Sequence, residues 1–165
     1  MSERKMLIML IAAFLFLICL ILAAIGSNDG LAEDGEYFIL CRPGSRVNVR
    51  NKPKKDAPVT AWVEFGQYVR TDGKEKNGYV HVTCLASEEP DGWIYAGYLV
   101  EEEPRKREYK AEVWEGDVIA RKCIDGKRVC KLKEGRIVTV YAQTNRWAVT
   151  NKGYIMCDWL KEVDP

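Results

Sequence analysis

The stretch Asp91-Gly-Trp-Ile-Tyr-Ala-Gly-Tyr-Leu-Val100 decides the fold, because a second version of it returns near the C-terminus as Lys152-Gly-Tyr-Ile-Met-Cys-Asp-Trp-Leu-Lys161. Aligning the first glycines matches similar residues: Gly92 with Gly153, Trp93 with Tyr154, Ile94 with Ile155, Tyr98 with Trp159 and Leu99 with Leu160. Each version closes a run of short alternating segments, which is the pattern of β-strands. The sequence therefore predicts two tandem small β domains, at residues 37–100 and 109–163.

The segments before each version are short and are separated by turn residues. Residues 59–64 alternate, so one face should be buried while Trp62 lies on the other face. Asn77-Gly78 is typical of a tight hairpin. Strands of this length and spacing favour a small sandwich or barrel, and no helix is predicted after residue 25. The charged residues 101–108 are interpreted as a solvated linker.

The N-terminus is strongly apolar. Residues 6–25 contain no charged side chain, and as a helix they would span roughly 30 Å, which matches the hydrocarbon core of a bilayer. Arg4 and Lys5 precede this segment, and the next basic residue is Arg42. This asymmetry predicts a single-pass protein whose N-terminus is cytoplasmic and whose remainder is extracytoplasmic.

A cleaved signal sequence is the alternative for residues 1–26. Its apolar region usually spans only ~7–15 residues, which favours an uncleaved anchor here. Ala24-Ile25-Gly26 nevertheless suits cleavage near Gly26, which would give a secreted protein. Residues 27–36 are small, acidic and glycine-containing, as expected of a flexible stalk.

Several motifs together resemble the bacterial Src-homology-3 (SH3) domain. They are Val47-Asn-Val-Arg50 with Pro53, the segment from Val59 to Gly66, and the closing Gly92-Trp-Ile with Tyr98-Leu99. Residues 109–163 resemble a divergent copy, which keeps Arg121, Gly135 and the closing motif but lacks the asparagine and the proline.

The resemblance implies two tandem SH3-like barrels of five to six strands each. It also implies binding, often to peptidoglycan peptides, and places Tyr98 and Trp159 at the groove aromatic of SH3 domains. No catalytic module accompanies the two domains, so a non-enzymatic protein is expected. The hypothesis is therefore a membrane-anchored protein that holds the cell wall, and the alternative is an interaction or scaffold module for another envelope protein.

Outward aromatic residues are the candidates for ligand contact. In the closing strands Ile94 and Ile155 should point into the core, which turns Trp93 and Tyr95 outward. Flat aromatic faces in a groove suit peptides or sugars. The predicted ligand-binding residues are Trp62, Tyr79, Trp93, Tyr95, Tyr98 and Trp159. Packing within a small core is the competing interpretation of these aromatics, and Trp147 is assigned to the core.

Five cysteines follow the apolar segment: Cys41, Cys84, Cys123, Cys130 and Cys157. An extracytoplasmic compartment permits disulfides. Asp125-Gly126 indicates a reversing turn that would bring Cys123 and Cys130 together. Cys41 with Cys84 would staple the first domain, leaving Cys157 to a buried site or a partner.

Other classes of function lack a signal. The cysteines have no paired Cys-x-x-Cys spacing, so no metal is expected, and no cofactor motif is present. The only histidine, His81, lies three residues from Cys84 on a predicted strand, so their side chains should face opposite sides. The formal net charge of +1 and the dispersed basic residues argue against nucleic-acid binding.

Overall fold

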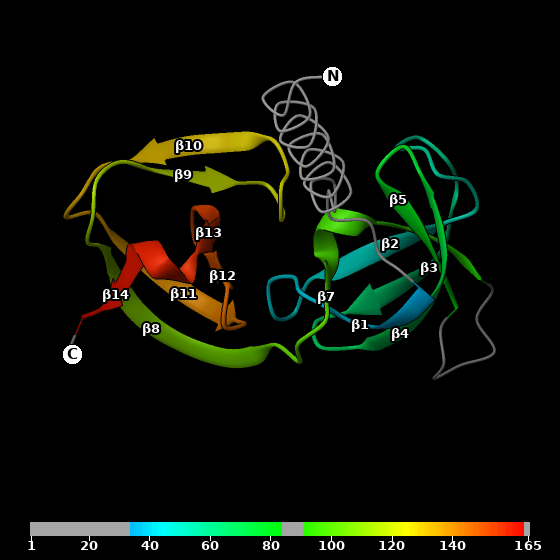
Figure 1. The fold of residues 1–165 in the computed structure, drawn as a ribbon, viewed down its shortest axis with the longest axis horizontal. Coiled ribbons are helices and arrows are strands. Elements are labelled where there is room, and N and C mark those ends of the chain that lie inside the picture. Colours follow the sequence, from blue (N-terminus) through cyan, green and yellow to red (C-terminus); the bar gives the residue numbers. More distant parts are fainter. Residues whose placement is uncertain (1–33, 84–90, 164–165) are drawn as a thin grey trace, which may run out of the picture. The chain divides into compact units, whose positions relative to one another are not determined.

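The computed structural model describes residues 34–83 and 91–163 (Figure 1). Within these ranges the regular structure is β-strand apart from two short 3-10 helices. None of the helices found there has the length and apolar character needed to cross a bilayer. The predicted anchor at 6–25, Cys84 and the acidic residues 85–90 lie outside the described residues.

The first sheet contains seven antiparallel strands in the order β3-β2-β6-β5-β4-β1-β7. These strands are β1 (Asp34–Ile39), β2 (Arg46–Arg50), β3 (Val59–Glu64), β4 (Tyr68–Lys76), β5 (Tyr79–Thr83), β6 (Gly92–Tyr95) and β7 (Leu99–Val100). The 3-10 helix η1 (Ala96–Tyr98) connects β6 to β7. The hairpin between β4 and β5 turns at Asn77 and Gly78, which both have positive φ, as the sequence predicted.

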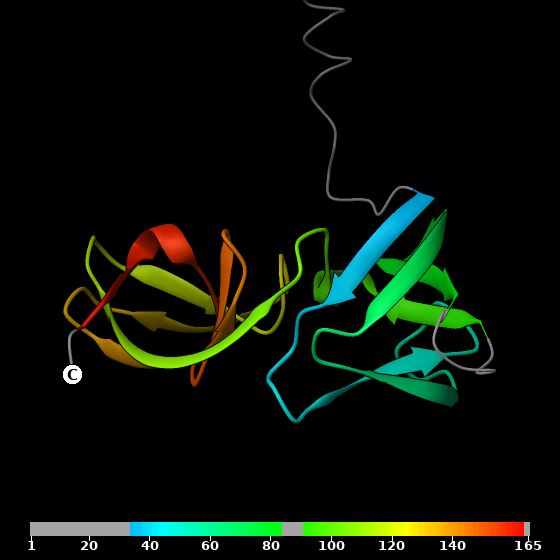
Figure 2. The ribbon, with the colours of Figure 1, turned by 90° about the horizontal axis from the view of Figure 1, so that it is seen from below.

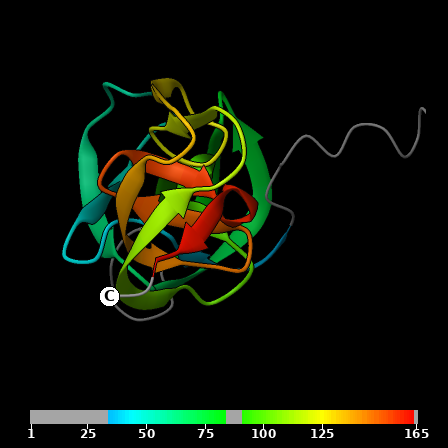
Figure 3. The ribbon, with the colours of Figure 1, turned by 90° about the vertical axis from the view of Figure 1, so that its left-hand side faces the viewer.

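The second sheet has the order β10-β9-β13-β12-β11-β8-β14, so it repeats the first strand for strand. Its strands are β8 (Arg105–Val113), β9 (Val118–Arg121), β10 (Arg128–Leu132), β11 (Ile137–Gln143), β12 (Trp147–Thr150), β13 (Gly153–Met156) and β14 (Leu160–Glu162). The 3-10 helix η2 (Cys157–Trp159) connects β13 to β14. Figure 2 shows β8 as a long curved strand, and β14 pairs with it at the C-terminus (Figure 3).

Each sheet packs around its own core of aliphatic side chains. Alternation along the strands places every second side chain inside, which is clearest in β2, β3 and β5. Ile94 and Ile155 are completely buried in the two cores, as predicted. Trp147 is buried, whereas the side chain of Trp62 is 55% exposed, and both placements agree with the sequence interpretation.

The aligned glycines sit where two strands approach closely. A Cβ on Gly92 would lie 2.5 Å from Val49 Cγ1 and 2.9 Å from the Arg50 carbonyl oxygen. A Cβ on Gly153 would collide with the carbonyl oxygen of Arg121, the residue that aligns with Arg50. Both glycines therefore allow the closing strand to lie against the end of β2 or β9.

A third cluster joins the two sheets, whose described residues belong to one compact unit. Leu40, which directly follows β1, packs with Ala142, Val149 and Tyr154 from the second sheet, and all four are buried. The Tyr154 hydroxyl donates a hydrogen bond of 2.8 Å to the Leu40 carbonyl. The sequence left open whether the two halves pack together, and these contacts show that they do.

Two boundaries differ from the sequence prediction. Strand β1 begins at Asp34, inside the stretch 27–36 interpreted as a stalk. Strand β8 begins at Arg105, inside the predicted linker 101–108, and pairs with β11 through Arg105 and Lys106. The side chains of residues 105–108 are exposed as expected, but charge patterning reports on side chains and not on backbone pairing.

The predicted disulfide between Cys123 and Cys130 is wrong, because both thiols are free. Asp125-Gly126 does reverse the chain, but Cys123 faces the cluster between the sheets while Cys130 packs against the core of the second sheet. Cys41 is also free and buried, and Cys84, its predicted partner, lies outside the described residues. Cys157 is free and half-buried.

Candidate binding groove

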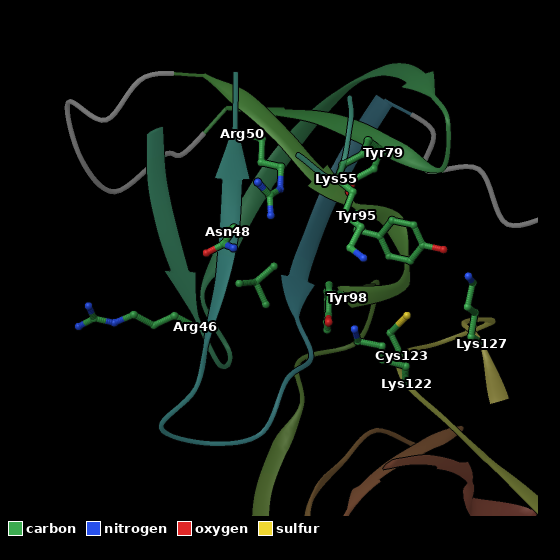
Figure 4. Close-up of a pocket in the computed structure, with 11 residues that line it drawn as sticks. Arg46, Asn48, Arg50, Lys55, Tyr79, Tyr95, Tyr98, Lys122, Cys123 and Lys127 are labelled. Atoms are coloured by element: carbon green, nitrogen blue, oxygen red, sulfur yellow. The ribbon is translucent and has the colours of Figure 1, made fainter. Parts of the chain in front are cut away.

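A cavity of about 480 Å³ lies where the first sheet meets a loop of the second sheet (Figure 4). Strand β2 and the loop after it form one side, the ends of β5, β6 and η1 form another, and the loop between β9 and β10 contributes the rest. The lining residues are Arg46, Val47, Asn48, Arg50, Lys55, Tyr79, Tyr95, Tyr98, Lys122, Cys123 and Lys127. We call this cavity the composite groove.

Three tyrosines give the composite groove its apolar surface. The rings of Tyr79 and Tyr95 meet edge to face with centroids 5.4 Å apart, and those of Tyr95 and Tyr98 do so at 6.4 Å. All three side chains are half-buried. Burial raises the pKa of Tyr95 and of Tyr98, so their phenols stay protonated at neutral pH and can donate hydrogen bonds.

Positive charge surrounds these tyrosines, and no carboxylate is among the lining residues. The Arg46 side chain extends away from the groove (Figure 4) and its Nε donates to Glu64 Oε1 at 3.0 Å. Arg50 Nη1 donates to the Ala57 carbonyl at 2.5 Å. Lys55, Lys122 and Lys127 are exposed and form no ion pair with the described residues, so their ammonium groups are available to a ligand.

The β9–β10 loop is held against η1 by backbone contacts. The Ile124 N–H donates to the Gly97 carbonyl at 3.0 Å. A Cβ on Gly97 would lie 2.6 Å from the Ile124 carbonyl oxygen and 2.9 Å from Cys123 Sγ, so only glycine leaves room for the loop. The position of the β9–β10 loop, which forms one side of the composite groove, is therefore fixed by the packing of the two sheets.

The structure distributes the predicted ligand residues over several places. Tyr79, Tyr95 and Tyr98 line the composite groove, whereas the other three candidates lie elsewhere. Trp93 packs on His81, with ring centroids 5.1 Å apart. Trp62 is exposed on β3 with the Arg46 guanidinium 5.8 Å from its ring centroid.

Trp159 lines a smaller hollow of about 210 Å³ on the second sheet. All seven lining residues occupy positions equivalent to residues of the composite groove. The pairs, groove residue first, are Arg46 with Asp117, Val47 with Val118, Asn48 with Ile119, Arg50 with Arg121, Tyr79 with Trp147, Tyr95 with Met156 and Tyr98 with Trp159. The hollow has no lysine and no tyrosine, so the same place in the two sheets has different chemistry.

Sequence reasoning did not assign any polar residue to the composite groove, whose polar lining is Arg46, Asn48, Arg50, Lys55, Lys122 and Lys127. Asn48 was noted as part of a motif, but nothing indicated where its side chain points. Lys122 and Lys127 flank a turn in the other half of the chain, so only the packing of the two sheets brings them to Tyr95 and Tyr98.

The described thiols and histidine do not form a reactive constellation. Burial raises the pKa of Cys41 to about 11 and that of Cys157 to about 11, so both thiols are protonated and weakly nucleophilic at neutral pH. His81 Nδ1 lies 3.0 Å from Asp72 Oδ2, while Cys84 is outside the described residues. Among the residues that the structure describes, no group of three His, Cys, Asp or Glu side chains could hold a metal ion.

A comparison with known protein families identifies a domain that covers β2 to β7 of the first sheet. Residues 45–100 match the family model of the bacterial SH3 domain, so the region carrying Arg46, Tyr79, Tyr95 and Tyr98 is one such domain. No curated protein sequence matches the chain.

Two solved structures from Trichomonas vaginalis are similar to this chain. NlpC2 shares 19% identity over 82% of this chain and 51% of its own, with a TM-score of 0.31. NlpC1 shares 22% identity over 84% of this chain and 50% of its own, also with a TM-score of 0.31. The chain thus spans about half the length of these two proteins.

Proposed function

We propose that this protein is a non-catalytic binding protein of the bacterial cell envelope, and that its composite groove holds peptidoglycan or the peptides of the cell wall. One observation carries the proposal: the bacterial SH3 domain at residues 45–100 supplies the three tyrosines that line the groove. Rigid aromatic faces offer large contact areas at little cost in conformational entropy, which suits an extended peptide.

The second sheet is proposed to be a divergent copy of the same domain, so that the chain holds two tandem SH3-like barrels. Its strand order repeats that of the first sheet. Arg121 Nη1 donates to the Gly126 carbonyl at 3.0 Å, as Arg50 does to Ala57, so an arginine at the same position ties the following loop in both sheets. Such agreement in side-chain roles supports duplication more strongly than sheet topology alone.

The envelope location is proposed from the N-terminal sequence. Residues 6–25 would anchor the protein in the membrane with the binding domains outside the cytoplasm, and Arg4 and Lys5 support this orientation. Secretion after cleavage near Gly26 would bring the same domains to the same compartment. Either route would expose the composite groove to the cell wall.

The direct test is co-sedimentation of the full-length protein with purified, protein-free cell-wall sacculi over a series of salt concentrations. A mild non-ionic detergent keeps the apolar N-terminus soluble. We expect saturable retention that persists at moderate salt, because contacts with a shaped groove are screened less than diffuse charge attraction. Absence of saturable retention by correctly folded protein would overturn the proposal.

A matched pair of variants places the site. Asn48→Trp fills the composite groove from an exposed position on β2, and we expect it to abolish retention. Ile137→Trp adds the same bulk at a position on β11 that is 44% exposed and outside the groove, so it should bind like the wild type. Equal retention of both variants would show that the groove is not the binding site. Tyr98→Ala is less informative, because Tyr98 also packs against two hydrophobic clusters.

A protein-interaction module is the alternative function. Three tryptophans favour it, because Trp62, Trp114 and Trp159 are 55%, 50% and 39% exposed and aromatic residues are enriched at protein interfaces. In that case sacculi would not retain the protein, and cross-linking in intact cells would capture one partner protein. Loss of that capture on changing Trp114 to alanine would place the interface on the second sheet.

A further inference from the structure

We infer that the ligand of the composite groove carries a carboxylate group and that Lys122 and Lys127, both supplied by the second sheet, bind it. This inference rests on the proposed wall-binding function, and it names the part of a wall peptide that the groove recognises. It also gives the second sheet a direct role in binding by the bacterial SH3 domain.

The backbones of the two lysines are paired. The Lys122 N–H donates to the Lys127 carbonyl at 2.9 Å, which closes the β9–β10 loop at its base. Both side chains then line the same cavity. No described carboxylate forms an ion pair with either lysine. An incoming carboxylate would therefore meet two cations that have no counter-charge among the described residues.

The loop that carries the two lysines, residues 122–127, is called the lysine loop, and it is anchored on both sides. On the side of the first sheet, Ile124 is hydrogen-bonded to Gly97. On the side of its own sheet, Arg121 binds the Gly126 carbonyl. A Cβ on Gly126 would collide with Cys123 Sγ, so the turn is tight as well. A carboxylate would therefore meet cations whose backbone is already ordered, which lowers the entropic cost of binding.

The lysine pair is not a general consequence of the fold. In the first sheet the equivalent backbone bond runs from the Asn51 N–H to the Pro58 carbonyl at 3.1 Å, and neither residue is charged. The smaller hollow on the second sheet likewise lacks lysine. Of these two described sites, the composite groove is the one that combines two lysines with tyrosine hydroxyls, which can both donate hydrogen bonds to an anion.

The test uses the full-length protein and two preparations of the same sacculi. One preparation is untreated, and in the other the carboxylates are converted to carboxamides with a carbodiimide and ammonia. We expect the wild-type protein to bind the amidated sacculi about tenfold more weakly, the size that about 1.4 kcal/mol of lost interaction produces. Lys122→Gln/Lys127→Gln should bind untreated sacculi about tenfold more weakly, and amidation should weaken this variant little further.

The control variant is Lys106→Gln/Lys133→Gln, which removes two exposed lysines of the second sheet that lie outside the groove. It should keep wild-type affinity and wild-type sensitivity to amidation. Thermal melting of each variant checks that the fold is retained. Asp125→Asn removes a negative charge from the loop that carries both lysines. We expect this variant to bind untreated sacculi slightly more tightly than the wild type.

The outcomes separate this inference from the proposed function. If the wild type binds both preparations equally, or if both double variants lose the same affinity, the carboxylate assignment is wrong while wall binding stands. If the wild type binds neither preparation, the proposed function itself fails. Equal loss in the two double variants would indicate attraction by overall charge and not by the lysine pair.

Discussion

At the scale of single residues, Tyr154 makes the contact that links the two sheets most directly. Its side chain is 5% exposed, its hydroxyl donates to the Leu40 carbonyl, and its ring meets that of Tyr98 edge to face at 6.4 Å. Burial raises the pKa of Tyr154 strongly, so the hydroxyl keeps its proton and remains a donor. Tyr154 therefore packs against Tyr98, one of the three tyrosines that line the composite groove.

Changing Tyr154 to phenylalanine removes only this hydroxyl. We expect the free energy of unfolding to fall by about 1–2 kcal/mol, because the Leu40 carbonyl would be left buried without this donor. Urea denaturation measures the effect. Tyr141→Phe is the matched control, because Tyr141 is half-buried and its contact is with Arg42 over the ring face, so its stability should change by less than about 0.5 kcal/mol. Equal effects in the two variants would contradict the role given to the hydrogen bond.

The alignment of Trp93 with Tyr154 illustrates what sequence can and cannot show about a residue. It matched the two positions correctly, since both lie in closing strands beside an arginine of the neighbouring strand. It gave no sign that Tyr154 faces the other sheet while Trp93 packs on His81. Contacts between the two halves depend on how the sheets meet, which local alternation does not encode.

At the scale of elements, the closing strands β6 and β13 show why the repeated glycine was informative. A side chain at Gly92 would approach the backbone of Arg50, and one at Gly153 would approach the backbone of Arg121. The repeated glycine therefore reflects a steric requirement. Strand β3 was predicted from a different signal, the alternation of residues 59–64, which reflects the burial of one face. The predicted disulfide across the β9–β10 loop was wrong for a local reason. The turn pairs the backbones of Lys122 and Lys127, but this pairing does not bring the side chains of Cys123 and Cys130 together.

Replacing Gly92 or Gly153 by alanine should lower the free energy of unfolding by different amounts. Gly92→Ala meets a side-chain methyl and a carbonyl oxygen, and some of that space can be regained by a shift of Val49. Gly153→Ala meets a backbone carbonyl and also imposes a φ of +123°, which is strained for any other residue. We expect a loss of about 1–3 kcal/mol for Gly92→Ala and about 1–2 kcal/mol more for Gly153→Ala. Urea denaturation of both variants decides the order, and a larger loss for Gly92→Ala would contradict it.

At the scale of the whole molecule, the cluster shared by the two sheets connects two small cores. Domains of ~60 residues are marginal by themselves because they bury a small fraction of their surface. Leu40, Ala142 and Val149 add buried apolar area that neither sheet provides alone. The same packing positions the lysine loop, so stability and the shape of the composite groove have a common origin.

Leu40 tests this coupling, because it is completely buried in the shared cluster while the equivalent residue of the second sheet, Trp114, is 50% exposed. We expect the wild-type sheets to melt in one calorimetric transition, with equal calorimetric and van't Hoff enthalpies. Leu40→Ala should lower stability by about 2–5 kcal/mol and separate the transition into two, because the cavity weakens the contact between the sheets. Trp114→Ala, the matched control, should cost less than about 1 kcal/mol and keep one transition. Two transitions in the wild type would show that the sheets unfold independently, and the lysine loop would then be free to leave the groove.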